Sequence, residues 1–236
     1  MKDRRISIAI DGPAGAGKTT VAREVARRLG YKYVDTGAMY RAVAWKSLDL
    51  GIALSDEDAI IKMTSQLNID FAEGDGSRIF VDGLDVSREI RSPEVTRLSS
   101  PVSAISGVRR LLVAQQRRLA EGGGVVMEGR DIGSVVLPNA EVKIFLTASV
   151  DERARRRWKE LRSLGLDADL ESIKRDIRER DERDSTRADS PLVKAQGAVE
   201  INTDRLTIEE VVDRIMYLVS FDEHKSVIPP AVIEED

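Results

Sequence analysis

The sequence predicts a three-layer α/β fold in which a five-stranded parallel sheet lies between helices on both faces. Short apolar runs, typical of strands buried on both sides, recur at residues 6–10, 31–35, 125–127, 142–146 and 199–202. Amphipathic helical patterns separate these runs, and this alternation favours a parallel sheet. A glycine-rich segment joins the first run to the helix that follows it.

The overall composition narrows the classes of protein that the chain can represent. Its 236 residues suit a single domain over 1–236. The lack of cysteine excludes disulfides and thiolate metal sites, and the single histidine, His224, argues against a zinc site or a Ser-His-Asp triad. The net charge is −4, and no apolar stretch reaches the ~18 residues of a membrane span. We therefore expect a cytoplasmic protein that binds neither nucleic acid nor membranes, and we also expect a monomer.

Capping residues and apolar stripes place the helices. We expect them from residue 18 to Gly30, over 38–50, from a capping box at Ser55 and Asp58, from Ser92 with Pro93 as first helical residue, over 106–121, from Ser149 to about Leu164, from near Leu170, and from Thr207. The last helix should bury Ile208, Val211, Val212, Ile215 and Val219.

Residues 68–91 differ from the rest of the chain. Ile69 and Phe71 alternate with polar residues, and so do Ile79 and Val81 across the turn-rich segment 73–77. Strict alternation predicts strands with one face exposed to water. We therefore expect a small antiparallel β insertion at about 68–91.

A phosphate-binding loop follows the first strand. The segment GPAGAGKT at 12–19 matches G-x-x-x-x-G-K-[ST] in full, between a strand and a helix. Glycines let backbone N–H groups turn toward phosphate oxygens, Lys18 reaches the β- and γ-phosphates, and the Thr19 hydroxyl is suited to Mg²⁺. The predicted ATP-binding residues here are Gly12, Pro13, Ala14, Gly15, Ala16, Gly17, Lys18, Thr19 and Thr20. The loop alone leaves kinases, other ATPases and slow regulatory switches open, although the N-K-x-D signature of GTPases is absent.

Three further segments bear on the reaction. The segment DTGAMYR at 35–41 follows the second strand, GRDIG at 129–133 follows the third, and ERDERD at 179–184 is followed by Arg187. Ligands bind at the carboxyl edge of open α/β sheets, which is where the first two segments should lie. The third segment belongs to a helix whose apolar face becomes charged and should open into a cleft, unless it is simply a solvated, salt-bridged helix.

Together with the phosphate loop, these segments resemble the bacterial cytidylate kinase family of P-loop nucleoside monophosphate kinases, over about residues 5–220. The resemblance implies transfer of the γ-phosphoryl group of ATP, with Mg²⁺, to CMP or dCMP. It also implies an acceptor-binding role for the insertion and a helical lid over about 150–187. Related kinases of UMP or AMP, a P-loop regulatory NTPase and an RNA-binding module are the alternatives.

The resemblance assigns roles to individual residues. Catalytic residues would be Lys18, Arg130 and Arg187. Arg41, Arg130 and Arg187 would clamp the acceptor phosphate, with the Thr36 hydroxyl nearby, while Arg180 and Asp184 would read the sugar and Ser100, Arg109 and Asp131 the cytosine. The lid offers Arg153, Arg156 and Arg157 to the γ-phosphate, of which we name Arg157 as an ATP-binding residue. Glu128 would either support the Mg²⁺ waters or cap the end of its strand.

Overall fold

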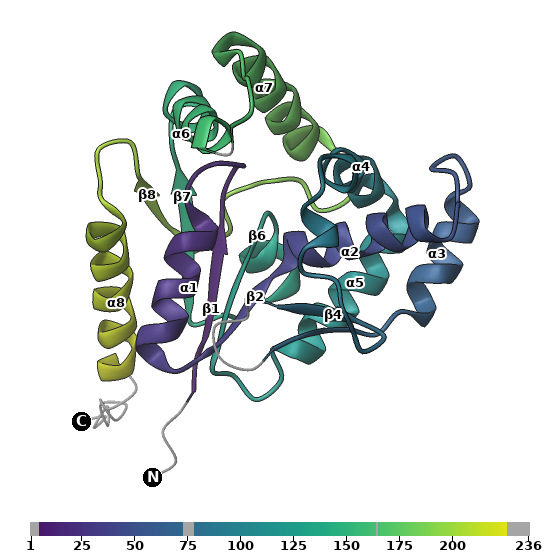
Figure 1. Ribbon diagram of the computed structural model, residues 1–236. Helices are drawn as coiled ribbons and strands as arrows, with labels where there is room; N and C mark the ends of the chain where they lie inside the picture. Colours follow the sequence, from purple (N-terminus) through teal and green to yellow (C-terminus); the bar gives the residue numbers. More distant parts are fainter. Residues whose placement is uncertain (1–4, 73–77, 164, 226–236) are drawn as a thin grey trace, which may run out of the picture.

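A computed structural model describes residues 5–72, 78–163 and 165–225. Its main sheet has five parallel strands, as predicted, and their order is β2-β6-β1-β7-β8 (Figure 1). The strands are β1 (Ser7–Asp11), β2 (Lys32–Asp35), β6 (Val125–Gly129), β7 (Val142–Thr147) and β8 (Val199–Asn202).

Helices cover both faces of this sheet, and two more stand above its edge. The helices are α1 (Lys18–Leu29), α2 (Thr36–Asp49), α3 (Glu57–Gln66), α4 (Pro93–Ala104), α5 (Ser106–Leu119), α6 (Val150–Ser163), α7 (Leu170–Thr186) and α8 (Ile208–Lys225), with short helical turns η1 (Glu89–Arg91) and η2 (Ile132–Val136). In Figure 1, α1 and α8 lie together on one side of the sheet, and α2 to α5 lie on the other. The predicted three-layer arrangement is confirmed.

Alternate residues of each strand supply two separate cores. Ile8 and Ile10 of β1 pack with α1 and α8, whereas Ala9 between them packs with the α2 to α5 side. Because successive side chains of a strand point to opposite faces, a sheet buried on both sides reads as an unbroken apolar run. This explains why the five strands could be found from the sequence.

The β insertion has one more strand than the predicted hairpin. Strands β3 (Ile69–Phe71), β4 (Ile79–Val81) and β5 (Leu84–Asp85) form an antiparallel sheet. The four apolar side chains that we expected on the inner face are buried. The expected turn at 73–77 lies outside the described residues. The insertion leads through η1 into α4, where the Ser92 hydroxyl accepts a hydrogen bond from the Val95 N–H at 3.3 Å, as its predicted capping role requires.

Two local predictions are wrong. Helix α3 is capped by Asp56 rather than Ser55, because the Asp56 carboxylate accepts the Ala59 N–H at 3.0 Å. Ile208 was expected in the buried stripe of α8, but it is the first residue of that helix and is 53% exposed. The rest of that stripe is buried. Neither difference alters the elements around the candidate site.

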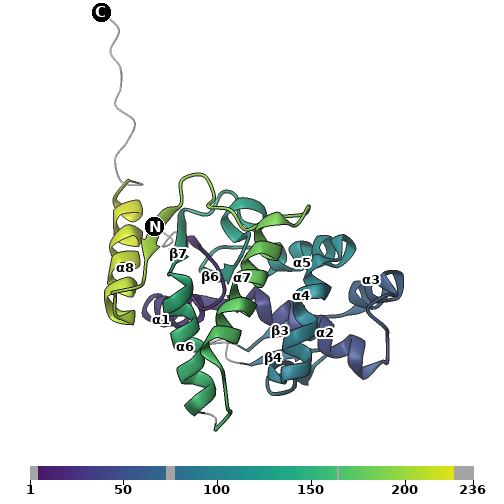
Figure 2. The ribbon, with the colours of Figure 1, turned by 90° about the horizontal axis from the view of Figure 1, so that it is seen from above.

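Helices α6 and α7 stand above the carboxyl edge of the sheet as a separate layer (Figures 1 and 2). They share a small core of Ala154, Ile173 and Ile177. The side chain of Trp158 packs against this core and donates a hydrogen bond to the Ala168 carbonyl at 3.0 Å. In the part of the chain that the structure describes, no helix combines the length and apolarity required to cross a membrane.

Candidate active site

The loop between β1 and α1 has the backbone of a phosphate cradle. Gly12, Gly15 and Gly17 have φ angles of 147°, 79° and 92°, which side chains rarely allow. At Gly12 a Cβ atom would also lie 2.1 Å from the Leu146 carbonyl oxygen. The helix that begins at Lys18 directs its N-terminus, with its partial positive charge, at the same space.

Lys18 is buried beneath this loop. Its ammonium donates a hydrogen bond to the Pro13 carbonyl at 2.8 Å. Burial, and next the like charge of Arg130, lower the pKa of Lys18 to about 7. A bound phosphate would favour the charged form, because opposite charges raise the pKa of an amine. The site is therefore built for an anion that stabilises the lysine in return.

The neighbouring polar groups suit Mg²⁺ carried by a nucleotide. Thr19 and Thr20 lie exposed in the first turn of α1, and Thr19 is close enough to the Glu128 carboxylate to favour its charged form. Burial, and then the nearby Asp35, raise the pKa of Glu128, which also accepts the Tyr33 hydroxyl at 2.6 Å. Among the described residues no three His, Cys, Asp or Glu form a metal cluster. Mg²⁺ commonly takes one or two protein ligands and completes its shell with phosphates and water, so Thr19 fits that role.

A second site lies between the sheet edge, α4, α5 and α7. Its lining includes all nine residues predicted to bind the acceptor: Thr36, Arg41, Ser100, Arg109, Arg130, Asp131, Arg180, Asp184 and Arg187. Five further lining residues were not predicted from the sequence, namely Gly37, Tyr40, Ser99, Ser103 and Gly129. We call this cleft the arginine pocket. Five arginines face two aspartates in it, a formal excess of three positive charges.

Buried ion pairs fix the pocket. Arg109 Nη2 donates to Asp131 Oδ2 at 2.5 Å, and Arg130 Nε donates to Asp184 Oδ2 at 2.8 Å. Arg187 is more loosely placed, with its Nη atoms 3.9 Å from Asp131 Oδ1 and 3.8 Å from Asp184 Oδ1. Burial opposes ionisation of Asp184, but Arg130 prevails and holds its pKa below the ordinary value. The two aspartates therefore orient the arginines before any ligand arrives.

Several donors in the pocket have no hydrogen-bond partner among the described residues. They are Nε of Arg41, Nε of Arg109, Nε of Arg180 and Nη2 of Arg187. Burial lowers the pKa of Arg180 to about 10, and Arg130 adds to the shift. Buried polar groups are normally hydrogen-bonded, and leaving one unpaired costs about 1–3 kcal/mol. Unpaired cationic donors that converge on one cleft indicate an anionic ligand.

Two predicted residues sit differently from what their motifs implied. Arg187 was expected on the helical face with Arg180 and Asp184, but it is the residue that caps the end of α7, with an extended ψ of 143°. Its Nε donates to the Ser190 carbonyl at 2.7 Å, which still directs the side chain into the pocket. The Thr36 hydroxyl donates to the Glu128 carbonyl at 2.7 Å, so in this conformation it has only lone pairs to offer.

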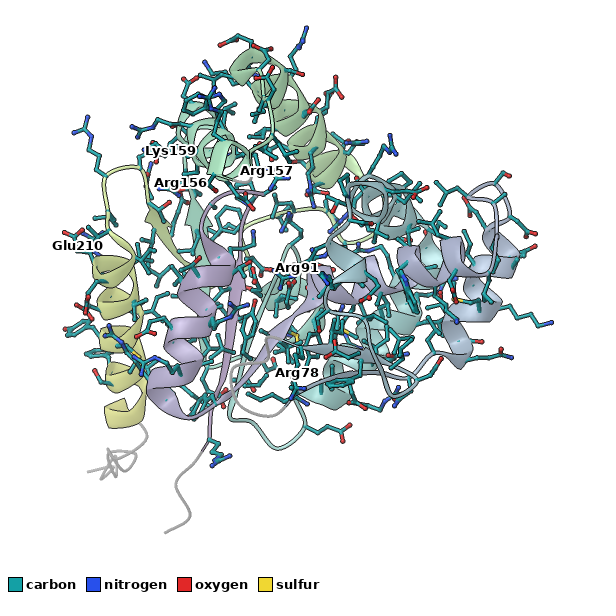
Figure 3. The ribbon with its side chains drawn as sticks, viewed as in Figure 1. Arg78, Arg91, Arg156, Arg157, Lys159 and Glu210 are labelled. Atoms are coloured by element: carbon teal, nitrogen blue, oxygen red, sulfur yellow. The ribbon has the colours of Figure 1, made fainter. Side chains whose placement is uncertain are left out.

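Arg91, which follows the β insertion, is a cation near Arg41 that was not predicted from the sequence. Asp35 binds Arg41 at 2.9 Å. Burial opposes ionisation of Asp35, but Arg41 and, more weakly, Arg91 of η1 keep its pKa below the ordinary value. Figure 3 shows Arg91 beside α2. No sequence signal marks it, because its position depends on how the insertion folds back onto α2.

The three arginines of α6 that were predicted to offer contacts to the γ-phosphate have different numbers of partners. Arg153 is buried and binds Asp181 through both Nη atoms, at 3.0 and 2.7 Å, and also the Ala14 carbonyl of the phosphate loop at 3.2 Å. Arg156 donates hydrogen bonds to the Oγ1 and carbonyl oxygens of Thr203, at 3.1 and 2.8 Å. Arg157 is paired only with the exposed Glu160, at 2.7 Å. Figure 3 shows Arg156 and Arg157 together on α6, above the start of α1.

Comparison with known proteins identifies the family of the chain. The family model for cytidylate kinase matches residues 8–220. The chain is 54% identical to a cytidylate kinase of Desulfitobacterium hafniense (strain Y51), covering 91% of this chain and 93% of the relative. It is 56% identical to a cytidylate kinase of Desulforamulus reducens, covering 89% and 94%. An uncharacterized protein from Eubacterium ventriosum, 12% identical, shares the fold with a TM-score of 0.50 over 92% of this chain and 99% of that one. Because the family model matches most of the sequence and close relatives align along nearly their whole length, the chain belongs to the cytidylate kinase family.

Proposed function

We propose that this protein transfers the γ-phosphoryl group of ATP to CMP or dCMP. The observation that carries the proposal is the set of unpaired, buried arginine donors in the arginine pocket, next to a phosphate-binding loop. A nucleoside monophosphate brings about two negative charges, which would offset most of the pocket's excess of three positive charges. The family and the relatives' names support a cytidine base.

The base would be read by Asp131, Arg109 and Ser100. Asp131 is ion-paired with Arg109 and accepts hydrogen bonds, which suits the N4 amino group of cytosine. Arg109 only donates, which suits the cytosine N3 and O2 acceptors. Uracil presents a carbonyl where cytosine has the amino group, so a carboxylate repels it. UMP and AMP remain the alternative acceptors that this arrangement disfavours.

Catalysis would be mainly positioning and charge stabilisation. Arg41, Arg130 and Arg187 hold the acceptor phosphate, Lys18 meets the charge on the transferred group, and Arg180 with Asp184 places the sugar. Mg²⁺, when bound at Thr19 with the nucleotide, would neutralise charge on the β- and γ-phosphates. A phosphate monoester oxygen is already nucleophilic at neutral pH, so the chain needs no general base.

The β insertion and the α6–α7 layer would act as moving parts. Closure over both nucleotides would exclude water and so prevent hydrolysis of ATP. The weak tether of Arg157 supports its assignment to the γ-phosphate, since it has the fewest bonds to give up among the three lid arginines. We expect the enzyme to act as a monomer in the cytoplasm without nucleic acid.

A coupled assay of ADP formation tests the function. ATP and Mg²⁺ are supplied with CMP, dCMP, UMP, AMP or GMP in turn. We expect CMP or dCMP to give the highest kcat/KM. Slow ATP hydrolysis that no monophosphate stimulates would instead indicate a regulatory NTPase, and a preference for UMP or AMP would move the protein to a related kinase activity.

A further inference from the structure

Asp11 is a buried acid that the reaction described above does not use. It ends β1 directly before Gly12 of the phosphate loop, and its side chain is 2% exposed. Its Oδ1 atom accepts the Ile132 N–H at 2.8 Å, and its Oδ2 atom accepts the Gly133 N–H at 2.7 Å. These partners lie 121 and 122 residues further along the chain.

The two N–H groups belong to the start of η2. The first N–H groups of a helical turn have no partner within the turn, so another group must satisfy them. Here two successive N–H groups each receive one carboxylate oxygen. An aspartate can do this fully, whereas an asparagine offers one oxygen and would turn its own NH₂ group toward the second donor.

The segment that Asp11 fixes carries the residue expected to read the base. Asp131 immediately precedes Ile132, and its carbonyl accepts the N–H groups of Val135 and Val136 at 2.9 and 3.1 Å. The backbone of Asp131 is therefore tied into η2, and η2 is tied to β1 through Asp11. The Asp131 carboxylate then holds Arg109.

Charged groups on both sides act on Asp11. Burial is the main reason why its pKa is raised to about 6, and the negative charge of Asp131 adds to this, while Lys18 opposes it. Lys143 of β7 approaches the same place, since its Cδ and Asp11 Oδ2 would each lie 3.4 Å from a Cβ placed on Gly133. Asp11 thus stands between the lysine of the phosphate loop and the aspartate of the arginine pocket. Burying a charge is costly unless it is hydrogen-bonded, and the N–H groups of Ile132 and Gly133 supply these bonds to Asp11.

We propose that Asp11 is a positioning residue for the acceptor, which holds the main chain after Asp131 so that the Asp131–Arg109 pair faces the base. This inference rests on the proposed function, because it assumes that the arginine pocket binds the monophosphate. Asp11 touches neither nucleotide in this role. It acts through the backbone of η2.

The test compares Asp11→Asn with the wild type and with a matched control, Glu141→Gln. Glu141 also accepts a backbone N–H of β1, that of Ser7 at 2.9 Å, but at the opposite end of the strand. The KM values for CMP and for ATP, and the ratio of kcat/KM for CMP to that for UMP, are measured in all three proteins. The activity of the wild type on CMP is measured first. If the wild type is inactive on CMP, the proposed function is wrong, and this outcome is distinct from a failure of the role proposed for Asp11.

For Asp11→Asn we expect the KM for CMP to rise roughly tenfold, as loss of a supporting hydrogen bond behind a binding residue does in other sites. The KM for ATP should change less than about threefold, and the CMP-to-UMP ratio should fall. Glu141→Gln should leave all three values unchanged. Equal changes in both KM values, or no change in the CMP values, would overturn the proposal.

A second variant covers the case in which Asp11→Asn does not fold. Gly133→Ala keeps the carboxylate but crowds it, because the added Cβ would lie 3.4 Å from Asp11 Oδ2 and 3.2 Å from the Ala195 Cβ. It should raise the KM for CMP in the same direction and by a smaller factor. A Gly133→Ala enzyme with wild-type KM for CMP and wild-type base preference would contradict the proposal.

Discussion

The arginine pocket and the α6–α7 layer are both rich in arginine, but they pair these residues differently. In the pocket, Arg109 and Arg130 bind buried aspartates 22 and 54 residues away in the sequence. On α6, the exposed Arg155 and Arg157 bind glutamates three residues away on the same helix, the half-buried Glu152 and the exposed Glu160. Exposed local pairs contribute little to stability, whereas breaking a buried pair is costly.

This difference indicates two ways in which arginines can bind a phosphate group. The pocket is organised before the ligand arrives, at the cost of desolvating its charges. The layer above it keeps exposed arginines such as Arg157, whose partners can be exchanged at little cost. This would suit the proposed opening and closing of the layer. Substitutions in the two regions should therefore differ in size and in the quantity that they change.

The largest effect should come from the phosphate loop itself. Lys18→Ala should lower kcat by roughly 10²–10³, because Lys18 meets charge that is greatest in the transition state. The melting temperature of the variant should change far less than its turnover. In the described part of the chain, the Lys18 ammonium of the unliganded protein donates one hydrogen bond, to the Pro13 carbonyl. Single-turnover kinetics with Mg-ATP and CMP measure this effect. Near-wild-type turnover would remove Lys18 from the catalytic residues.

The buried charges behind the pocket should make stability depend on pH. The pKa of Asp11 is about 6 in the folded protein against 3.8 ordinarily, so between these values the folded state binds more protons than the unfolded state. The free energy of unfolding should therefore fall as pH rises through this window. The wild type should therefore lose about 3 kcal/mol of unfolding free energy between about pH 4 and pH 7 from this group, whereas Asp11→Asn does not titrate and should lack this pH-dependent loss, whatever its stability at pH 4.

Glu152, a carboxylate on α6, should make the free energy of unfolding depend on pH in the opposite direction. Burial opposes ionisation of Glu152, but hydrogen bonds from Arg155 and Arg156 hold its pKa below the ordinary value. Its contribution to stability is therefore present at neutral pH and is lost as pH falls through its folded pKa. Urea unfolding of wild type, Asp11→Asn and Glu152→Gln at several pH values measures both. Parallel pH curves for all three proteins would mean that neither carboxylate is placed as described.

Base choice should depend on the buried pair in the pocket. Asp131→Asn can donate as well as accept, so it should lower the CMP-to-UMP ratio of kcat/KM about tenfold or more, equivalent to roughly 1.4 kcal/mol. Glu160→Gln on the lid serves as the control and should leave the ratio unchanged. If Asp131→Asn slows both substrates by the same factor, Asp131 acts only by orienting Arg109.

Much of this arrangement could be predicted from the sequence, because buried parallel strands leave unbroken apolar runs and the phosphate loop requires glycines at fixed spacing. All nine predicted acceptor residues line one cleft. Most of them follow strand ends or lie at α7, whereas Ser100 on α4 and Arg109 on α5 could be named only from the family resemblance. Strand β5 was missed because its residues Leu84 and Asp85 are both exposed and show no alternation. Asp11 was missed because its partners lie on a strand-end segment 121 residues away, which no local pattern reveals.

The smallest expected effect separates the lid arginines from one another. Arg157 and Arg155 are both exposed on α6 and both bind a glutamate three residues away, yet only Arg157 is the candidate for the γ-phosphate. Arg157→Ala should lower kcat/KM for ATP about fivefold, close to 1 kcal/mol, the scale of one exposed charge interaction. Arg155→Ala is the matched control, with the same loss of charge on the same helix and no expected change.

Raising the salt concentration should shrink the difference between the two variants, because exposed charges are screened. Arg153→Ala would confuse the test, since that side chain also holds the phosphate loop through the Ala14 carbonyl. Equal losses of kcat/KM for ATP in Arg155→Ala and Arg157→Ala would show that α6 attracts ATP only through its overall charge. The α6–α7 layer would then have no specific contact to set against the preorganised arginine pocket.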